Sequence, residues 1–79
     1  MLTGVDGIMV EMEAVQSETV VSVGYDDGAS ELHVRYRSSP SVYVYQAVPR
    51  DLFDRLMADG SKGGFLHREI KGVYAVYRI

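Results

Sequence analysis

One stretch in the middle of the chain, residues 41–48, most constrains what the chain can fold into. It reads Ser-Val-Tyr-Val-Tyr-Gln-Ala-Val and is followed by Pro49. Aromatic and β-branched side chains alternate along it with a period of two, which is the pattern of a pleated β-strand. The chain before it contains strand and turn patterns, whereas the chain after it is mostly helical in its period. We therefore expect an α+β protein whose sheet precedes its helices.

Two further strands are expected before this stretch. Residues 19–25 are rich in β-branched side chains, and the Asp-Asp-Gly triplet at 26–28 has the composition of a turn. Residues 31–37 then alternate cleanly between apolar and polar side chains, as is typical of an antiparallel sheet covered on one side. The apolar face of this second strand carries Leu32, Val34 and Tyr36.

From Pro49 onward the apolar residues recur at helical spacing. Pro49 suits the start of a helix, because its missing N–H costs nothing there. The apolar face of this first helix carries Leu52, Phe53, Leu56 and Met57. Gly60 suits its end, and Ser61 can cap a second helix that ends at Gly72. The apolar residues of the second helix are Phe65, Leu66 and Ile70.

The expected architecture is an antiparallel three-stranded meander followed by two short helices packed on one face. Residues 8–14 also alternate with period two, so residues 1–14 are expected to be either a loose leader or a fourth, N-terminal edge strand. Residues 15–79 are expected to form a single domain. Residues 73–79 are either a last short strand or an extended segment lying on the core.

The turn between the second and third strands leaves two pairings open. A three-residue loop, 38–40, sets Arg35 opposite Tyr43 and His33 opposite Tyr45. That pairing places the tyrosines beside the basic side chains on an open face of the sheet, as in proteins that bind single-stranded RNA.

A four-residue loop, 38–41, instead sets Tyr36 opposite Tyr43 and turns the tyrosines into the core. The open face would then carry His33, Arg35, Arg37, Val42, Val44 and Gln46. We favour this second pairing, because Pro40 cannot adopt the left-handed φ that the shorter loop requires at its third position.

Composition limits the classes of function. The chain has 79 residues, no cysteine and a net charge of −3. No run approaches the roughly 18 apolar residues that span a bilayer, and the N-terminus lacks a secretory signal, so we expect a cytoplasmic protein that does not enter a membrane. His33 and His67 lie on different elements with no nucleophile or set of metal ligands beside them. We therefore expect a protein that is not an enzyme and that uses no metal or cofactor.

Several motifs occur in a characteristic order along residues 15–79. They are Val15-x-Ser17, Val20-x-Ser22-Val23-Gly24-Tyr25-Asp26, Leu32-x-Val34-x-Tyr36, Tyr43-x-Tyr45, Val48-Pro49, Ser61-x-Gly63-x-Phe65-Leu66-x-x-x-Ile70 and Tyr74-x-x-x-Arg78-Ile79. This combination resembles the KTSC domain, whose central Tyr-x-Tyr matches Tyr43 and Tyr45. Residues 1–14 lie outside the pattern, and Ser38-Ser39-Pro40 replaces the more usual glycine-containing turn.

The resemblance implies little about activity. The KTSC family occurs at the C-terminus of some lysyl-tRNA synthetases and as small stand-alone proteins of bacteria and phages. Its function is not established, and RNA binding has been suggested from the synthetase context.

The candidate binding residues are basic and aromatic. Lys62, Arg68, Lys71 and Arg78 form the main basic set, with Tyr74 close by, and Arg35 and Arg37 form a second set on the sheet. If the ligand is RNA, the cations would bind phosphates and a tyrosine would stack on a base. We favour an adaptor or protein-interaction module, which includes a homo-oligomer, and keep the RNA-binding domain as the alternative.

Overall fold

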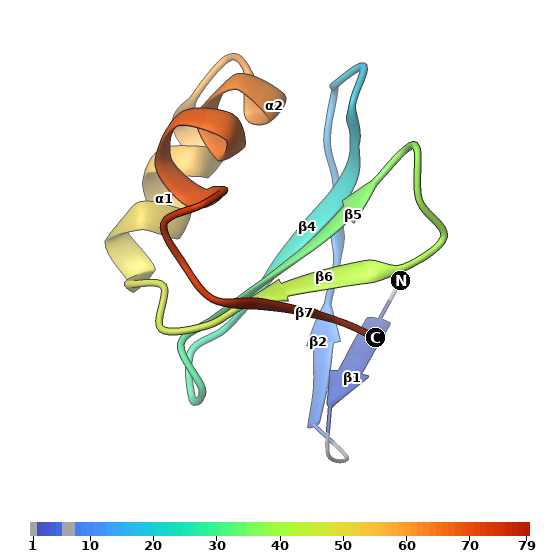
Figure 1. The fold of residues 1–79 in the computed structure, drawn as a ribbon, viewed down its shortest axis with the longest axis vertical. Helices are drawn as coiled ribbons and strands as arrows, with labels where there is room; N and C mark the ends of the chain where they lie inside the picture. Colours follow the sequence, from blue (N-terminus) through green and yellow to red (C-terminus); the bar gives the residue numbers. More distant parts are fainter. Residues whose placement is uncertain (1, 6–7) are drawn as a thin grey trace.

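The computed structural model describes residues 2–5 and 8–79 (Figure 1). The strands are β1 (Leu2–Val5), β2 (Ile8–Glu11), β3 (Glu13–Ala14), β4 (Val20–Asp26), β5 (Glu31–Tyr36), β6 (Val42–Tyr45) and β7 (Val76–Arg78). The helical elements are α1 (Arg50–Ala58), α2 (Lys62–Phe65) and the π-helical turn η1 (Leu66–Ile70).

The main sheet is an antiparallel meander of five strands. Its order is β3-β4-β5-β6-β7, and β1 and β2 form a separate two-stranded sheet. Figure 1 shows α1 and α2 together on one side of the main sheet. The α+β class, the antiparallel meander and the two short helices are therefore as the sequence predicts, with more strands than expected. The C-terminal segment is a strand: β7 pairs with β6.

The pairing of β5 with β6 follows neither of the two expected registers. Val34 lies opposite Tyr43, and Arg35 lies opposite Val42. This register is shifted by two residues from the favoured one, so the same side chains still share a face. After Tyr36 the chain continues along β4 instead of β6, because the N–H of Arg37 donates to the carbonyl of Thr19 at 2.8 Å.

The core fills the space between the sheet and the helices. Its buried members are Val20, Val23, Leu32, Val34, Tyr36, Tyr45, Val48, Leu52, Leu56, Phe65, Leu66 and Ile70. Tyr45 is 3% exposed and Tyr43 is half-buried against this core, so the prediction that the tyrosines face the core is confirmed. Each fully buried aliphatic side chain contributes roughly 1.5–3 kcal/mol relative to its exposed state.

The opposite face of the sheet is not open, and that prediction is wrong. His33, Val42 and Val44 are 1%, 5% and 0% exposed, although Arg37 and Gln46 remain exposed as expected. This face is covered by residues near the N-terminus, whose close approach involves Gly24.

A β-carbon added at Gly24 would lie 2.5 Å from the carbonyl oxygen of Glu11 and 2.9 Å from the sulfur of Met12. The backbone at residues 10–12 therefore passes close over β4, and Val10 and Met12 are each 5% exposed there. The sequence did not indicate this layer. Val10 and Met12 pack on β4, which lies beyond a turn in the chain, and the local alternation of residues does not show such a contact.

The helices begin where the sequence places them. α1 follows Pro49, and the hydroxyl of Ser61 accepts a hydrogen bond of 3.2 Å from the N–H of Gly64 at the start of α2. α1 ends at Ala58 with Asp59 as its C-cap, just before the expected Gly60. The last turn widens into η1, where the N–H of Lys71 donates to the carbonyl of Leu66 at 2.8 Å.

Candidate functional site

A groove runs between the helical layer, the start of β4 and the β5–β6 loop. It consists of two hollows of about 500 and 530 Å³, which share Glu18, Thr19, Tyr36 and Lys71. The first, here called the tyrosine hollow, is lined by Glu18, Thr19, Tyr36, Arg37, Ser38, Ser39, Tyr43, Tyr45 and Lys71. The second, the glycine hollow, adds residues 16–17, residues 60–64 and His67.

Close approach of α2 to the chain before β4 shapes the glycine hollow. A β-carbon added at Gly63 would collide with the hydroxyl of Thr19. Ser17 holds the preceding turn, because its hydroxyl accepts hydrogen bonds from the N–H groups of Thr19, at 3.2 Å, and Val20, at 3.1 Å. Gly63 and Ser17 therefore help to shape the wall of the groove.

Three tyrosines form the aromatic wall of the tyrosine hollow. The hydroxyls of Tyr36 and Tyr45 are hydrogen-bonded at 2.8 Å. The ring of Tyr43 meets that of Tyr36 edge to face, with centroids 5.3 Å apart. Burial raises the pKa of the Tyr36 hydroxyl well above its ordinary value, and it also raises the pKa of Tyr45. Both hydroxyls therefore keep their protons at neutral pH.

Two of the predicted cations lie at this hollow. The ammonium of Lys71 is 4.6 Å from the centroid of the Tyr36 ring, which is within the range of a cation–π interaction. Arg37 lines the same hollow, and its guanidinium donates through Nη2 to the carbonyl of Ser17 at 3.0 Å. Lys71 and Arg37 came from different predicted sets, and the fold brings them to one site.

Other predicted cations are occupied by contacts within the helical layer. The ammonium of Lys62 donates to the carbonyl of Met57 at 3.2 Å and also to that of Asp59. Arg68 lies 3.4 Å from the Asp59 carboxylate. These contacts satisfy the C-terminal end of α1 and the loop after it, so Lys62 and Arg68 act first as structural residues.

The remaining predicted residues lie apart. Arg35 is half-buried opposite Val42, and Arg78 is exposed on β7. Tyr74 is half-buried against the core. The seven predicted residues therefore do not form one surface. The sequence analysis also missed Tyr36 as part of the site, because its alternation marked it only as a core residue.

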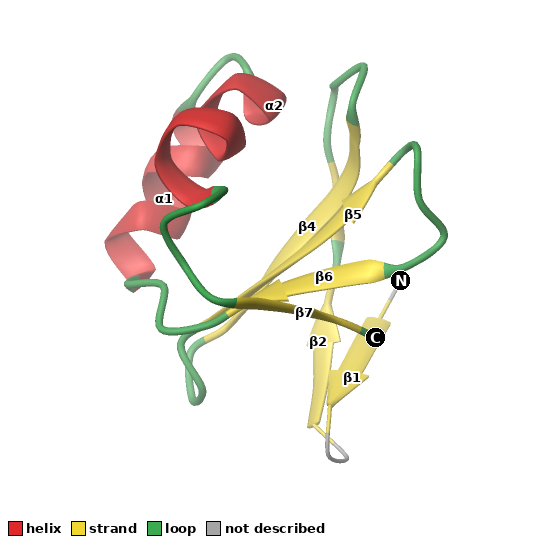
Figure 2. Ribbon diagram, in the orientation of Figure 1, coloured by secondary structure: helices red, strands yellow, loops and turns green. Residues whose placement is uncertain are grey.

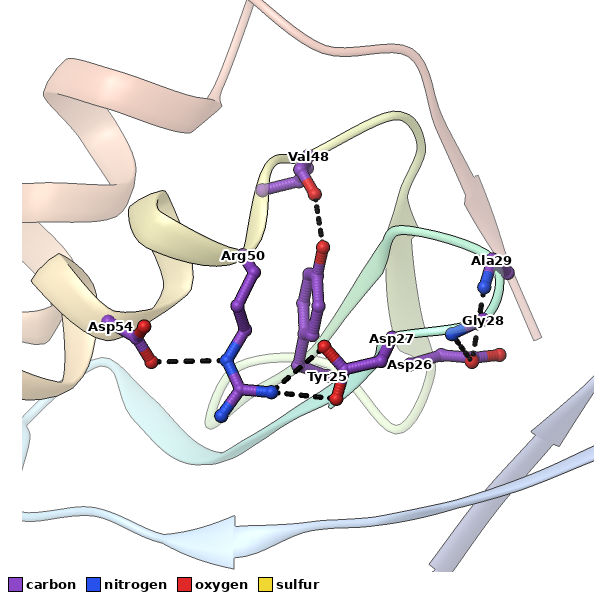
Figure 3. Close-up of polar contacts among 8 residues, drawn as sticks. All are labelled: Tyr25, Asp26, Asp27, Gly28, Ala29, Val48, Arg50 and Asp54. Atoms are coloured by element: carbon purple, nitrogen blue, oxygen red, sulfur yellow. Dashed lines mark hydrogen bonds and ion pairs between the residues drawn. The ribbon is translucent and has the colours of Figure 1, made fainter.

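A second polar cluster joins the turn after β4 to the start of α1 (Figure 3). Arg50 Nη1 donates to both carboxylate oxygens of Asp27, at 2.8 and 2.6 Å, and Arg50 Nε donates to Asp54 at 3.1 Å. Beside them, the hydroxyl of Tyr25 donates to the carbonyl of Val48 at 2.6 Å. Hydrogen bonding to Asp27 raises the pKa of Arg50. All of these groups are paired with one another, so we interpret the cluster as a structural clamp.

The described residues contain no group of three or more His, Cys, Asp or Glu side chains placed to hold a metal ion. In the same part of the chain, no helix has the length and apolar character needed to cross a membrane.

Comparison with known proteins identifies the family. The model of the KTSC domain matches residues 16–74. A protein of Tsukamurella paurometabola is 33% identical over 60 residues, which are 76% of this chain and 88% of that protein. A crystal structure of a KTSC domain protein from Yersinia pestis superimposes with a TM-score of 0.84 at 30% identity, covering 89% of this chain and 97% of the other. The resemblance seen in the motifs is thereby confirmed, and the chain belongs to the KTSC domain family.

Proposed function

We propose that this KTSC domain is a cytoplasmic, non-enzymatic binding module that docks a partner protein along the outer edge of β7. The observation that carries the proposal is the edge itself. β7 is the last strand of the main sheet and has β6 as its neighbour on one side (Figure 2). An unpaired strand edge is a template for another strand, and many adaptor domains bind extended peptides in this way.

The ladder between β6 and β7 shows which backbone groups face outward. The N–H and carbonyl of Ile79 bond to Val42, at 2.9 and 3.2 Å, and the carbonyl of Ala75 accepts from Gln46 at 2.8 Å. Because antiparallel partners alternate, the N–H and carbonyl groups of Val76 and Arg78 point away from β6. They are the groups that a docked strand would use.

The side chains along this segment support the same proposal. Among the described residues, the large hydrophobic side chains that are exposed are Val73, Val76 and Ile79, at 64%, 47% and 43%. All three lie in the last seven residues of the sequence. A partner strand laid beside β7 would cover apolar surface as well as satisfy the backbone.

A proline at position 76 tests this edge specifically. Val76→Pro removes an N–H that makes no bond to β6, so the sheet should remain intact while pairing at the outer edge is blocked. The wild-type protein, Val76→Pro and the matched control Val76→Ala would each be immobilised. The proteins that bind to each of them would then be compared. Self-association would be measured in parallel by sedimentation velocity.

We expect a partner, or a second copy of the chain, to be retained by the wild type and by Val76→Ala but lost with Val76→Pro. Equal retention by all three proteins would show that the edge is not the docking site. A wild-type protein that retains no partner and remains a monomer would contradict the proposal itself.

RNA binding is the second candidate function, and the position of Lys71 and Arg37 beside three tyrosines supports it. This arrangement combines cations with aromatic rings, as in single-strand binding sites. The test is fluorescence anisotropy with a labelled tRNA and a labelled single-stranded RNA across a salt series. An RNA-binding protein should lose affinity with a log–log slope of about −0.7 per phosphate contacted. Lys71→Glu should abolish that binding, whereas the control Arg55→Glu, an exposed residue of α1 outside the hollow, should not.

A further inference from the structure

Five cations of the chain lack a carboxylate partner within its described part. Arg50, Arg55 and Arg68 form ion pairs, and Lys62 donates to two carbonyls. The other four are Arg35, Arg37, Lys71 and Arg78, of which Arg37 also donates to one carbonyl, that of Ser17. Arg35 lies opposite Val42, and Arg78 lies opposite Tyr43 without lining the hollow, whereas Arg37 and Lys71 both line one concave site, the tyrosine hollow.

The charge at the tyrosine hollow is unbalanced by one unit. Lys71 and Arg37 contribute two positive charges, and Glu18, which also lines the hollow, contributes one negative charge. Glu18 forms no ion pair with either cation. A single positive charge in excess suits a monoanion better than a dianionic phosphate.

The tyrosine pair leaves one hydrogen-bond donor unused. Tyr36 and Tyr45 carry two hydroxyl protons, and their mutual bond of 2.8 Å uses only one of them. The second proton has no acceptor among the described residues. Tyr36 and Tyr45 both line the tyrosine hollow. A ligand oxygen inside the hollow can therefore accept this proton.

We propose that the tyrosine hollow binds a monoanionic carboxylate with a flat, apolar body. One carboxylate oxygen accepts the unused proton of the tyrosine pair, and Lys71 and Arg37 neutralise the charge. The body of the ligand lies against the ring of Tyr43, where aromatic groups pack edge to face or offset. The volume of about 500 Å³ suits a small molecule or one terminal residue of a peptide.

Two sources can supply this chemistry, namely a free aromatic acid or the C-terminus of a peptide that ends in an aromatic residue. The test is an NMR titration of the labelled protein with phenylacetate, with Gly-Gly-Gly-Phe as the free acid, and with the same peptide as its C-terminal amide. Inorganic phosphate is a fourth probe. We expect saturable shifts at Tyr43 and Lys71 with the acid or the free peptide, and weaker or no shifts with the amide and with phosphate. The tighter of the two carboxylates identifies the source.

Charge variants connect the binding to named residues. Lys71→Gln should weaken the affinity about tenfold, because it removes a charge-assisted contact. Arg55→Gln removes an exposed cation of α1 that does not line the hollow and should leave the affinity unchanged. Both residues are exposed, so neither change should affect folding.

The double variant Tyr36→Phe/Tyr45→Phe, checked for folding by its amide spectrum, should weaken carboxylate binding, because it removes both hydroxyls and either tyrosine alone would still have a proton to donate. The proposal is overturned if no carboxylate gives saturable shifts, if the amide binds as well as the acid, or if Lys71→Gln and Arg55→Gln have the same effect.

Discussion

Ala47 holds a left-handed backbone conformation, with a φ of 57°, in the connection between β6 and α1. The bonds on either side enforce it: the N–H of Gln46 donates to Ala75 at 2.8 Å, and the N–H of Val48 donates to Ser30 at 2.9 Å. This conformation costs a residue with a β-carbon roughly 1 kcal/mol, whereas glycine adopts it freely. Ala47→Gly should therefore raise the free energy of unfolding by up to about 1 kcal/mol, as measured by urea denaturation.

A substitution to glycine within a helix provides the control for Ala47→Gly. Ala58→Gly, at the end of α1, should lower the free energy of unfolding, because glycine is a poor helix former. If both substitutions lower it equally, the strain assigned to Ala47 is absent.

Tyr45 tests the aromatic part of the core at the same scale. Its side chain is 3% exposed, and its hydroxyl bonds that of Tyr36. Tyr45→Ala should cost about 3–5 kcal/mol through lost burial and the cavity left behind. Tyr45→Phe, the matched control, should cost about 1 kcal/mol through loss of one hydrogen bond. Chemical denaturation measures both. A loss of a few tenths of a kcal/mol in Tyr45→Ala is incompatible with a buried ring.

At the level of whole elements, Gly24 determines how closely the N-terminal segment can pack on β4. A β-carbon there would meet the backbone oxygen of Glu11 at 2.5 Å, and backbone cannot move as cheaply as a side chain. Gly24→Ala should cost about 1–3 kcal/mol as the segment is displaced.

Gly60 is the matched control for Gly24. A β-carbon added at Gly60 meets nothing within 4 Å, so Gly60→Ala should be neutral or slightly stabilising. Thermal unfolding followed by circular dichroism distinguishes the two. Equal melting temperatures for both variants would mean that the N-terminal segment is not tightly packed on the sheet.

At the scale of the whole molecule, the buried face around His33 makes stability depend on pH. His33 is 1% exposed, and burial lowers its pKa, although Glu31 and Asp26 act in the opposite direction. Below the unfolded value of about 6.5, the unfolded chain binds a proton that the folded chain resists. The free energy of unfolding should therefore fall as the pH decreases from about 7.5 to about 5.

Urea denaturation at several pH values measures this effect. The exposed His67 provides the control. His67→Gln should retain the loss of stability at low pH, whereas His33→Gln should make the free energy of unfolding depend less on pH. An unchanged pH profile in His33→Gln would assign the effect to other groups.

The candidate site was predictable only in part. Lys71 and Arg37 were both identified as candidate cations, but in separate sets, because they belong to different elements. Tyr36 was recognised as a core residue and not as the ring beneath Lys71. The contacts that engage Lys62 and Arg68 were also missed, because a list of charges does not show which carbonyl or carboxylate the fold brings near.

Local patterns determined the strands β4, β5 and β6, the helix starts and the face of the sheet that carries the tyrosines. Period-two alternation, Pro49 and the Ser61 cap act within a few residues, so the sequence alone was sufficient for them. The tertiary structure decided the rest. Val10 and Met12 cover the face that alternation marked as open, and Arg37 bonds Thr19, so the chain continues along β4 after Tyr36. Both depend on segments that meet only when the chain folds, and no local periodicity encodes such meetings.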